Sequence, residues 1–424
     1  MRVTKQMQHV DYLTRLLGFQ GFHVSGVEIE KEGEIEKAII TLGRSNRYIC
    51  SKCGRQLHST HSSFMQEVRH LHLWRYLTIL RFEKAKVRCP DCGVKVEKLD
   101  FLEKNKRITK DLSHQVSELC KVMTVEDVAT FEHLHWETVK NIDREAIERA
   151  QAQRNLEGIG VLGIDEISVG RGHNYWHLIS SLDGPKGSEM LYVGEGRKEE
   201  NLKHFWKWFG KERTEKITHG VMDMAKGFIN SFRAHCPSIK IIYDKFHVMR
   251  HLLNALNEVR KAEFRMAGKK KRGLLCGKKF ILLKRMSNLR GDARKALRGL
   301  LSVNRRIYKA HLLKESFGQL WSYTYKGAAK RFWENWKEQL KWQRLEPYRK
   351  FAMMIDRHID GILGYCDKKV SLGYIEGTNL KARNIIRKAY GYRDKQYMKL
   401  KIIQGCSSIG VFRPYPYPLH HNPG

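Results

Sequence analysis

The order of short apolar runs and amphipathic stretches between residues 156 and 248 is the best guide to the fold. Three consecutive strands are predicted over "GVLGIDEISV", "YWHLISSLDG" and "EMLYVGEG". There follow a helix over "KEENLKHFWKWFG", a strand over "KITHGVMDM", a helix over "AKGFINSFRAHCP" and a fifth strand over "KIIYDKFHV". The predicted order is βββαβαβ, which indicates an α/β core.

Two of these strands carry an aspartate at or near their ends. Asp165 lies in "GIDE" of the first strand, and Asp223 lies in "VMDM" at the end of the fourth. If the two strands are neighbours in the sheet, their carboxylates converge on one place and can bind a divalent metal. For either Asp alone, the alternative is a turn residue or a helix cap.

The balance of charge favours a polyanionic partner. The chain of 424 residues has 79 Lys and Arg against 45 Asp and Glu, a net charge of +34, which is typical of nucleic-acid binding. Apolar runs such as "FILL" are far shorter than the roughly 18 residues that cross a bilayer, and the polar start "MRVTKQMQHVDYL" is unlike a signal peptide. We therefore expect a soluble cytosolic protein of several domains.

Four of the nine cysteines form two pairs, "CSKCG" and "CPDCG". Each pair, Cys50 with Cys53 and Cys89 with Cys92, can place two thiolates on one metal, and the glycine after it supplies a positive φ for the turn. The residues between the pairs alternate as strands do, so the sequence predicts a structural zinc ribbon with four cysteine ligands. The alternative is disulfides or free thiols. The four histidines between the pairs are interpreted as surface or DNA-facing residues rather than ligands: His58, His61, His70 and His72.

A helical pattern over 111–150 has the outline of a helix-turn-helix. Thr124 is the expected N-cap, Asp127 follows at the third helical position, and a break is expected at 133–135. The second helix then presents Thr138, Lys140 and Asn141 outward, where they can meet a major groove. The alternative is a helical hairpin that does not contact DNA.

A third acid, Glu376, begins a predicted helix in "SLGYIEGTNLKARNIIRKAYGYRD". Asn379, Arg383 and Arg387 recur at helical spacing on nearly the same side, so one carboxylate and several phosphate-binding groups share a face. The alternative for Glu376 is an acid that interacts with the positive end of the helix dipole.

Between the fifth strand and Glu376 lies a segment that the core fold does not require. Residues 260–314 contain nineteen Lys and Arg against two acids, with leucines at helical intervals, which predicts an inserted helical domain with a cationic surface. Its basic cluster Lys269, Lys270, Lys271 and Arg272 is expected to contact DNA phosphates. The later tryptophans are expected in its core and interfaces: Trp321, Trp333, Trp336 and Trp342.

Together, the cysteine pairs, the helix-turn-helix, "GIDE", "VMD", "DKFH" and "EGTNLKARNIIRKAYGYR" resemble bacterial insertion-sequence transposases of the ISL3 type. The resemblance covers residues 45 to 405. It implies a ribonuclease-H-like catalytic core with a DDE triad, carried over here to Asp165, Asp223 and Glu376 as magnesium ligands. Asp244 and His247 then support the site or position DNA, with Asn379 beside them. Asp244 also ends a predicted strand, so the alternative is that Asp244 is the second ligand and Asp223 supports it.

The resemblance also implies a reaction and its partners. Two Mg²⁺ ions, or Mn²⁺, serve strand cleavage and then strand transfer of a 3′-hydroxyl, and structural Zn²⁺ holds the ribbon. The implied partners are DNA with terminal inverted repeats, target DNA and further copies in a homodimer or larger synaptic assembly on the nucleoid. The alternatives are a nuclease of the same fold that stops after hydrolysis, a non-catalytic DNA-binding regulator, and a structural RNA-binding protein.

The predicted architecture is multidomain α/β, a ribonuclease-H-like core of order βββαβαβ with an inserted helical domain, preceded by a zinc ribbon and a helix-turn-helix. Its predicted parts are an N-terminal segment 1–44, the ribbon 45–102, the helix-turn-helix region 103–155, the first part of the core 156–250, the basic helical insertion 251–365, the last part of the core 366–408 and a flexible, proline-rich tail 409–424.

Overall fold

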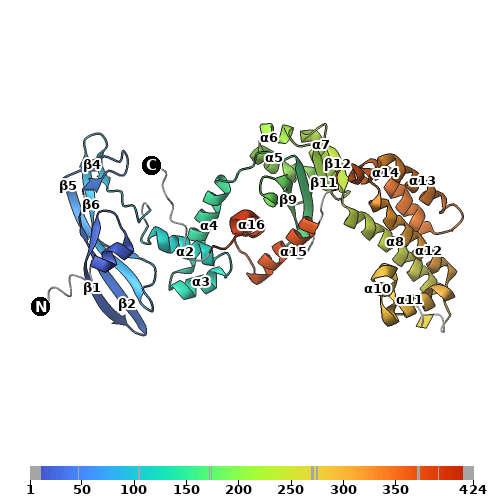
Figure 1. The fold of residues 1–424 in the computed structure, drawn as a ribbon, viewed down its shortest axis with the longest axis horizontal. Coiled ribbons are helices and arrows are strands. Elements are labelled where there is room, and N and C mark those ends of the chain that lie inside the picture. The colour runs from blue at the N-terminus through green and yellow to red at the C-terminus, as the bar shows by residue number, and fades with distance from the viewer. Residues whose placement is uncertain are drawn as a thin grey trace. The chain divides into compact units, whose positions relative to one another are not determined.

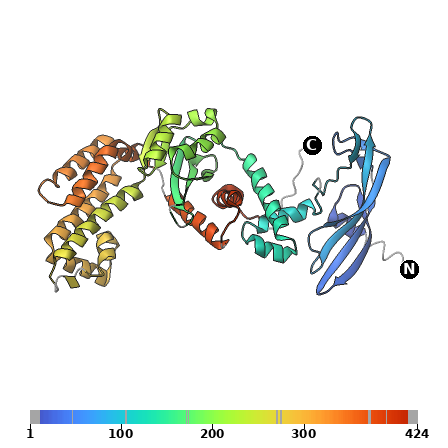
Figure 2. The same cartoon turned by 180° about the vertical axis from the view of Figure 1, so that it is seen from behind.

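The computed structural model describes residues 11–45, 47–103, 106–170, 172, 174–268, 272–273, 276–369, 373–389 and 391–413. The chain divides into two compact units (Figures 1 and 2), one reaching Ala152 and including the described residues from Val411, the other spanning residues 153–410. None of the described helices combines the length and the apolar character needed to cross a membrane.

A five-stranded sheet begins the N-terminal unit. Its strands are β1 (Phe22–Glu32), β2 (Ile35–Arg44), β5 (Thr60–Arg69), β6 (Leu77–Cys89) and β7 (Gly93–Val96). The order is β1-β2-β6-β5 with β7 on β6; β2 and β6 run parallel and the other pairs antiparallel. The strands predicted between the cysteine pairs are thus confirmed as β5 and β6, and β1 and β2 from residues 1–44 belong to the same sheet.

Three helices complete the unit: α2 (Lys110–Leu119), α3 (Val125–Glu132) and α4 (Trp136–Ala152). The predicted start of α3 is confirmed, because Thr124 and Asp127 form a capping box in which each side chain accepts the other residue's backbone N–H. The predicted break is confirmed too, since His133 adopts a left-handed conformation with φ 49°. Val128, Val139 and Ile142 are buried between the helices, as the helical spacing predicts.

Polar contacts tie this sheet to these helices. Arg69 at the end of β5 donates to the Glu132 carbonyl (3.0 Å), and Gln115 of α2 donates to the Glu132 carboxylate (2.7 Å). The prediction that His70 lies on the surface is wrong. His70 is buried, and its Nδ1 lies 2.9 Å from Thr109 Oγ1. Burial lowers the pKa of His70 to about 4, so the ring is neutral at pH 7.

The second unit is built on a mixed sheet of order β10-β9-β8-β11-β12. Its strands are β8 (Val161–Ser168), β9 (Tyr175–Gly184), β10 (Gly187–Glu195), β11 (His219–Met222) and β12 (Lys240–Tyr243). The first three are antiparallel, whereas β8, β11 and β12 run parallel. The helices α5 (Lys203–Phe209), α6 (Lys211–Glu215) and α7 (Lys226–His235) connect β10, β11 and β12. The predicted order βββαβαβ is confirmed.

The fifth strand is shorter than predicted. It ends at Tyr243, and "DKFHV" belongs to the start of α8 (Lys245–Met266) instead of the strand. Asp244 is the N-cap of this helix, because its Oδ1 accepts the Phe246 N–H (2.7 Å). Val248, which was predicted to lie in the strand, therefore lies on the buried side of this helix, where it and Leu252 are fully covered.

A helical region follows: α8, α10 (Lys279–Leu283), α11 (Gly291–Val303), α12 (Arg305–Phe317), α13 (Lys326–Glu338) and α14 (Glu346–Asp367). Trp321, Trp333 and Trp336 are buried in its core, as predicted. Trp342 was also predicted to lie in the core or an interface of this region, but its side chain is 88% exposed. Helix α14 returns to the sheet and packs closely against β12, since a Cβ on Gly364 would lie 3.2 Å from the Ile241 carbonyl oxygen.

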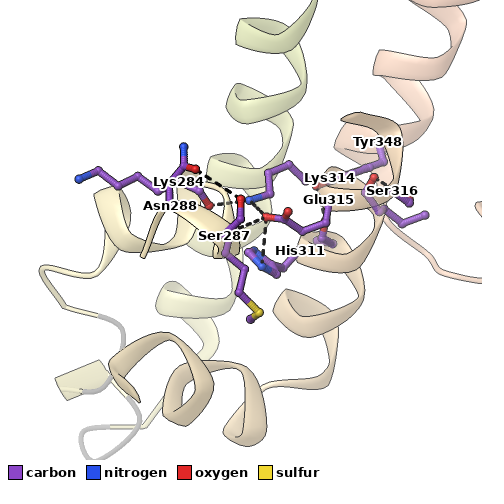
Figure 3. A network of polar contacts seen from close by, with 11 residues as sticks. Lys284, Ser287, Asn288, His311, Lys314, Glu315, Ser316 and Tyr348 are labelled. Carbon is purple, nitrogen blue, oxygen red and sulfur yellow. Dashed lines mark hydrogen bonds and ion pairs between the residues drawn. The ribbon is translucent and has the colours of Figure 1, made fainter. Parts of the chain in front are cut away.

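One of the basic residues of this region, Lys314, is buried and takes part in the polar network of Figure 3. Lys314 donates to the Lys284 carbonyl (2.7 Å), and its Nζ lies 2.5 Å from Glu315 Oε1. His311 Nε2 is 3.6 Å from the same carboxylate oxygen. Burial and the charge of Lys314 lower the pKa of His311 to about 4, so Glu315 balances one cation at pH 7. The predicted cationic surface therefore does not include Lys314.

Two further helices, α15 (Gly373–Lys388) and α16 (Lys395–Gly405), pack on the sheet. Ile375 of α15 packs against Gly163 of β8. A side chain at position 163 would crowd it, because a Cβ there would lie 2.9 Å from Ile375 Cδ1. In the N-terminal unit, Arg413 N–H donates to Glu118 (2.9 Å). Most of the predicted tail, residues 414–424, lies outside the described residues.

Candidate active site and metal centre

The four predicted zinc ligands lie together in the N-terminal unit. Cys50 and Cys53 come from the hairpin of β3 (Tyr48–Ile49) and β4 (Gln56–Leu57), and Cys89 and Cys92 come from the turn between β6 and β7. All four sulfur atoms lie within 4.8 Å of one another, and all four cysteines are free thiols.

The turns are shaped as the two glycines predicted, since Gly54 has φ 75° and Gly93 has φ 71°. The backbone N–H groups of Cys53 and Lys52 lower the pKa of Cys50 to about 6, which favours the thiolate that a metal binds. Four convergent sulfurs suit tetrahedral Zn²⁺ and leave no open position, as a structural site requires. The cluster is consistent with a zinc ribbon.

Asp165 lies within β8, and Asp223 directly follows β11, the parallel neighbour of β8. The register pairs Val221 of β11 with Gly163 of β8, so its continuation sets Asp223 beside Asp165. The Glu166 N–H donates to Asp165 Oδ1 (2.8 Å), and the Ala225 N–H donates to Asp223 Oδ1 (3.0 Å). The structure thus brings together the first two acids that the sequence analysis selected.

Asn379 joins this pair from α15. Its Nδ2 donates to Asp165 Oδ2 over 2.6 Å, although the two residues are 214 positions apart. Glu376 lies one turn earlier on α15, in the first helical turn, and its side chain is exposed. Among the described residues only the four cysteines form a group of three or more ligand atoms within 4.8 Å, so the three acids are spaced more widely than that.

Asp244 and His247 lie beside the acids on the first turn of α8. The Asp244 N–H donates to the Met222 carbonyl (2.9 Å), next to Asp223. His247 Nδ1 lies 3.2 Å from Asp244 Oδ2, and both residues are 8% exposed. Burial alone lowers the pKa of His247, but the carboxylates of Asp244 and Asp165 outweigh it, and the net pKa is raised.

Burial is the main reason that the pKa of Asp165 is raised, and the charge of Asp223 adds to it. The Glu166 N–H, His247 and Asn379 act in the opposite direction. The pKa of Asp165 is therefore raised mainly by burial, with a smaller contribution from the Asp223 carboxylate, and a bound cation would offset both effects.

Glu166 is a residue that the sequence analysis passed over. It is half-buried, lies 3.7 Å from Arg197, and has a raised pKa because of burial and the nearby charge of Asp223. The signal was present in "GIDE", but consecutive strand residues face opposite sides, so Asp165 and Glu166 are not expected to act together.

The predicted DNA-contacting residues occupy three places. Thr138, Lys140 and Asn141 lie on the N-terminal half of α4, where Asn141 is exposed and Lys140 Nζ is 5.3 Å from the Trp136 ring centre. Arg383 and Arg387 are exposed on α15.

The third place is the basic cluster of the helical region. Residues 269–271, which are Lys269, Lys270 and Lys271, lie outside the described residues. Arg272 donates to the carbonyls of Phe264 (3.2 Å) and Arg265 (3.1 Å), so its guanidinium binds the last turn of α8.

A mixed sheet of this order, with Asp165 on one central strand and Asp223 directly after its parallel neighbour, is consistent with a ribonuclease-H-like α/β core. The family of ISL3 DDE transposases, described as "Transposase", matches residues 162–402, more than half of the chain. The helix-turn-helix domain of transposase family ISL3 matches residues 97–147. The chain belongs to the ISL3 family of DDE transposases, and the resemblance inferred from the sequence is confirmed.

Two related transposases are similar to this chain over most of its length. The transposase for insertion sequence element IS1001 of Bordetella parapertussis is 27% identical over 389 residues, which cover 91% of this chain and 95% of the relative. The transposase for insertion sequence element IS1557 of Mycobacterium tuberculosis is 26% identical over 408 residues, 88% of each chain.

Proposed function

We propose that the protein binds the ends of its own insertion sequence, cleaves a DNA strand there and transfers the freed 3′-hydroxyl to target DNA. Its metal ligands in this proposal are Asp165, Asp223 and Glu376. The observation that carries it is the Asn379–Asp165 hydrogen bond, which brings the helix of Glu376 to the part of β8 beside which Asp223 lies.

The residues suit a magnesium site. Carboxylate oxygens are the ligands that Mg²⁺ prefers, and the raised pKa of Asp165 reflects burial and repulsion that a bound cation would offset. When bound, two Mg²⁺ ions, or Mn²⁺, activate the attacking oxygen and stabilise charge on the leaving oxygen. Neither step needs a covalent intermediate with the protein.

Asp223 is favoured over Asp244 as the second ligand. Asp244 is the N-cap of α8, with Oδ1 accepting the Phe246 N–H and Oδ2 3.2 Å from His247 Nδ1, whereas the β8–β11 register puts Asp223 beside Asp165. In the described part of the chain, the hydrogen bond of Asp223 uses Oδ1 alone, which leaves Oδ2 for a cation. Asp244 then fixes His247, and the raised pKa of His247 favours a positive charge beside Asp165.

The remaining groups bind and hold DNA in this proposal. The outward residues of α4 contact base edges and phosphates at the terminal inverted repeats, and the exposed Arg383 and Arg387 hold phosphates next to the acids. Two ends must be joined to one target, so the active form is a homodimer or a larger synaptic assembly.

The test uses a plasmid that carries the gene with its flanking DNA, incubated with the purified full chain and Mg²⁺. We expect breaks at two fixed positions outside the gene and products in which these ends are joined to new DNA, mapped by sequencing. Cleavage without joined products would indicate a nuclease of the same fold. No defined breaks with either Mg²⁺ or Mn²⁺ would contradict the proposal.

A further inference from the structure

The tip of the β5–β6 hairpin carries an unusual tryptophan. Leu73 and Tyr76 pair through two backbone hydrogen bonds (3.2 and 3.0 Å), so Trp74 and Arg75 form a two-residue loop. Trp74 has φ 56° there, a conformation for which such loops ordinarily use glycine. Its side chain is nevertheless 84% exposed, so burial within the chain does not compensate the strained backbone.

The hairpin tip is fixed against the helix-turn-helix. His72, two residues before Trp74, stacks on Phe131 with ring centres 6.2 Å apart, and its Nε2 lies 3.4 Å from Glu132 Oε2. Phe131 and Glu132 end α3, directly before the turn into α4. Two residues of extended chain reach about 7 Å, so Trp74 lies close to this turn.

The surroundings of the tip are suited to DNA. Phe131 is 54% exposed and Trp136, the first residue of α4, is 43% exposed, so aromatic rings stand on both sides of the turn. Arg75 next to Trp74 has a 72% exposed side chain and pairs with Glu36 (2.8 Å). These exposed aromatic residues belong to a hairpin and a helix-turn-helix that contact each other through His72, in a chain whose net charge is +34.

We infer that the Trp74 hairpin acts as a wing of the helix-turn-helix: its indole packs on sugars and bases of duplex DNA beside the segment that α4 contacts. The inference rests on the proposed DNA binding by this unit and adds a second contact to it. The two-residue loop and the His72 contacts fix the backbone from which the exposed indole projects, and aromatic side chains presented in this way can stack on bases.

The test compares full-length variants on the duplex that the wild-type chain selects from a random-sequence pool. Trp74→Gly suits the positive φ, so we expect thermal stability equal to or above wild type, but DNA affinity about ten- to a hundredfold lower and a footprint shortened on one side. Trp74→Phe should restore most of the affinity. Trp342→Ala, which removes the other strongly exposed tryptophan, should leave binding unchanged.

Equal affinity and an unchanged footprint for Trp74→Gly would overturn the inference, as would a change in oligomeric state in place of DNA affinity. If the pool yields no enriched sequence, specific recognition of ends fails, and the same variants measured on the unselected pool still decide the role of Trp74. A weaker Trp74→Gly complex there supports the wing; an equal one rejects it.

Discussion

Replacing Asp165 by Asn is expected to abolish strand cleavage and to leave DNA binding intact. The change removes a charge that a catalytic metal needs, and losses of transition-state charge stabilisation of this kind reach about a thousandfold or more. The amide oxygen keeps an acceptor for the Glu166 N–H, and Asn379 can turn its side-chain amide so that its oxygen accepts from the new NH₂ group, so β8 and α15 should remain folded. Glu376→Gln is expected to behave in the same way. The measurement is cleavage of end DNA in Mg²⁺ beside a binding assay with the same duplex.

A matched variant separates loss of a site from loss of any carboxylate. Asp360→Asn removes an exposed acid from α14 in the same unit and should cleave at the wild-type rate. Cleavage by Asp165→Asn at a tenth of the wild-type rate or faster would mean that Asp165 does not hold a catalytic metal.

Loss of zinc is expected to unfold the cysteine-bearing part of the N-terminal unit while the second unit stays folded. Zinc-finger peptides gain about 10–16 kcal/mol from structural zinc, so the small β3–β4 hairpin should not persist without it. Purified protein should contain about one zinc per chain, and Cys50→Ser or Cys92→Ser should lower that content and expose residues 48–98 to proteolysis.

Cys276→Ser is the matched control, because Cys276 is exposed and lies outside the cluster. Its zinc content and proteolysis pattern should equal those of wild type. Freshly purified wild-type protein without zinc, or a Cys50→Ser variant as resistant as wild type, would contradict a structural zinc site.

Local signals predicted much of the fold. The strands β8 to β11 follow from their apolar runs, and the start of α3 follows from Thr124 and Asp127, because a cap needs only residues three positions apart. The convergence of Asp165 and Asp223 required one further assumption, that their strands are neighbours, and the parallel β8–β11 pairing confirms it.

Other features depend on tertiary contacts that local sequence does not encode. "DKFHV" follows the apolar run of β12 without a Gly or Pro to mark a boundary, yet Asp244 caps α8 through the Phe246 N–H and the helix begins there. His70 is buried where it contacts the Phe19 ring and lies 2.9 Å from Thr109 Oγ1, both far from it in the sequence. The Asn379–Asp165 bond joins residues 214 positions apart, so the sequence could predict both residues but not their contact.

The comparison of Asp223→Asn with Asp244→Asn is the most direct test of the proposed site, because it identifies the second metal ligand. Both variants should fold, since Asn also caps helices and can accept the Ala225 N–H. Cleavage is assayed on end DNA in Mg²⁺ and in Mn²⁺. Asp223→Asn should be inactive, whereas Asp244→Asn, which disturbs only His247 and its surroundings, should be slowed by about 10- to 100-fold. An active Asp223→Asn beside an inactive Asp244→Asn would contradict the account and make Asp165, Asp244 and Glu376 the triad.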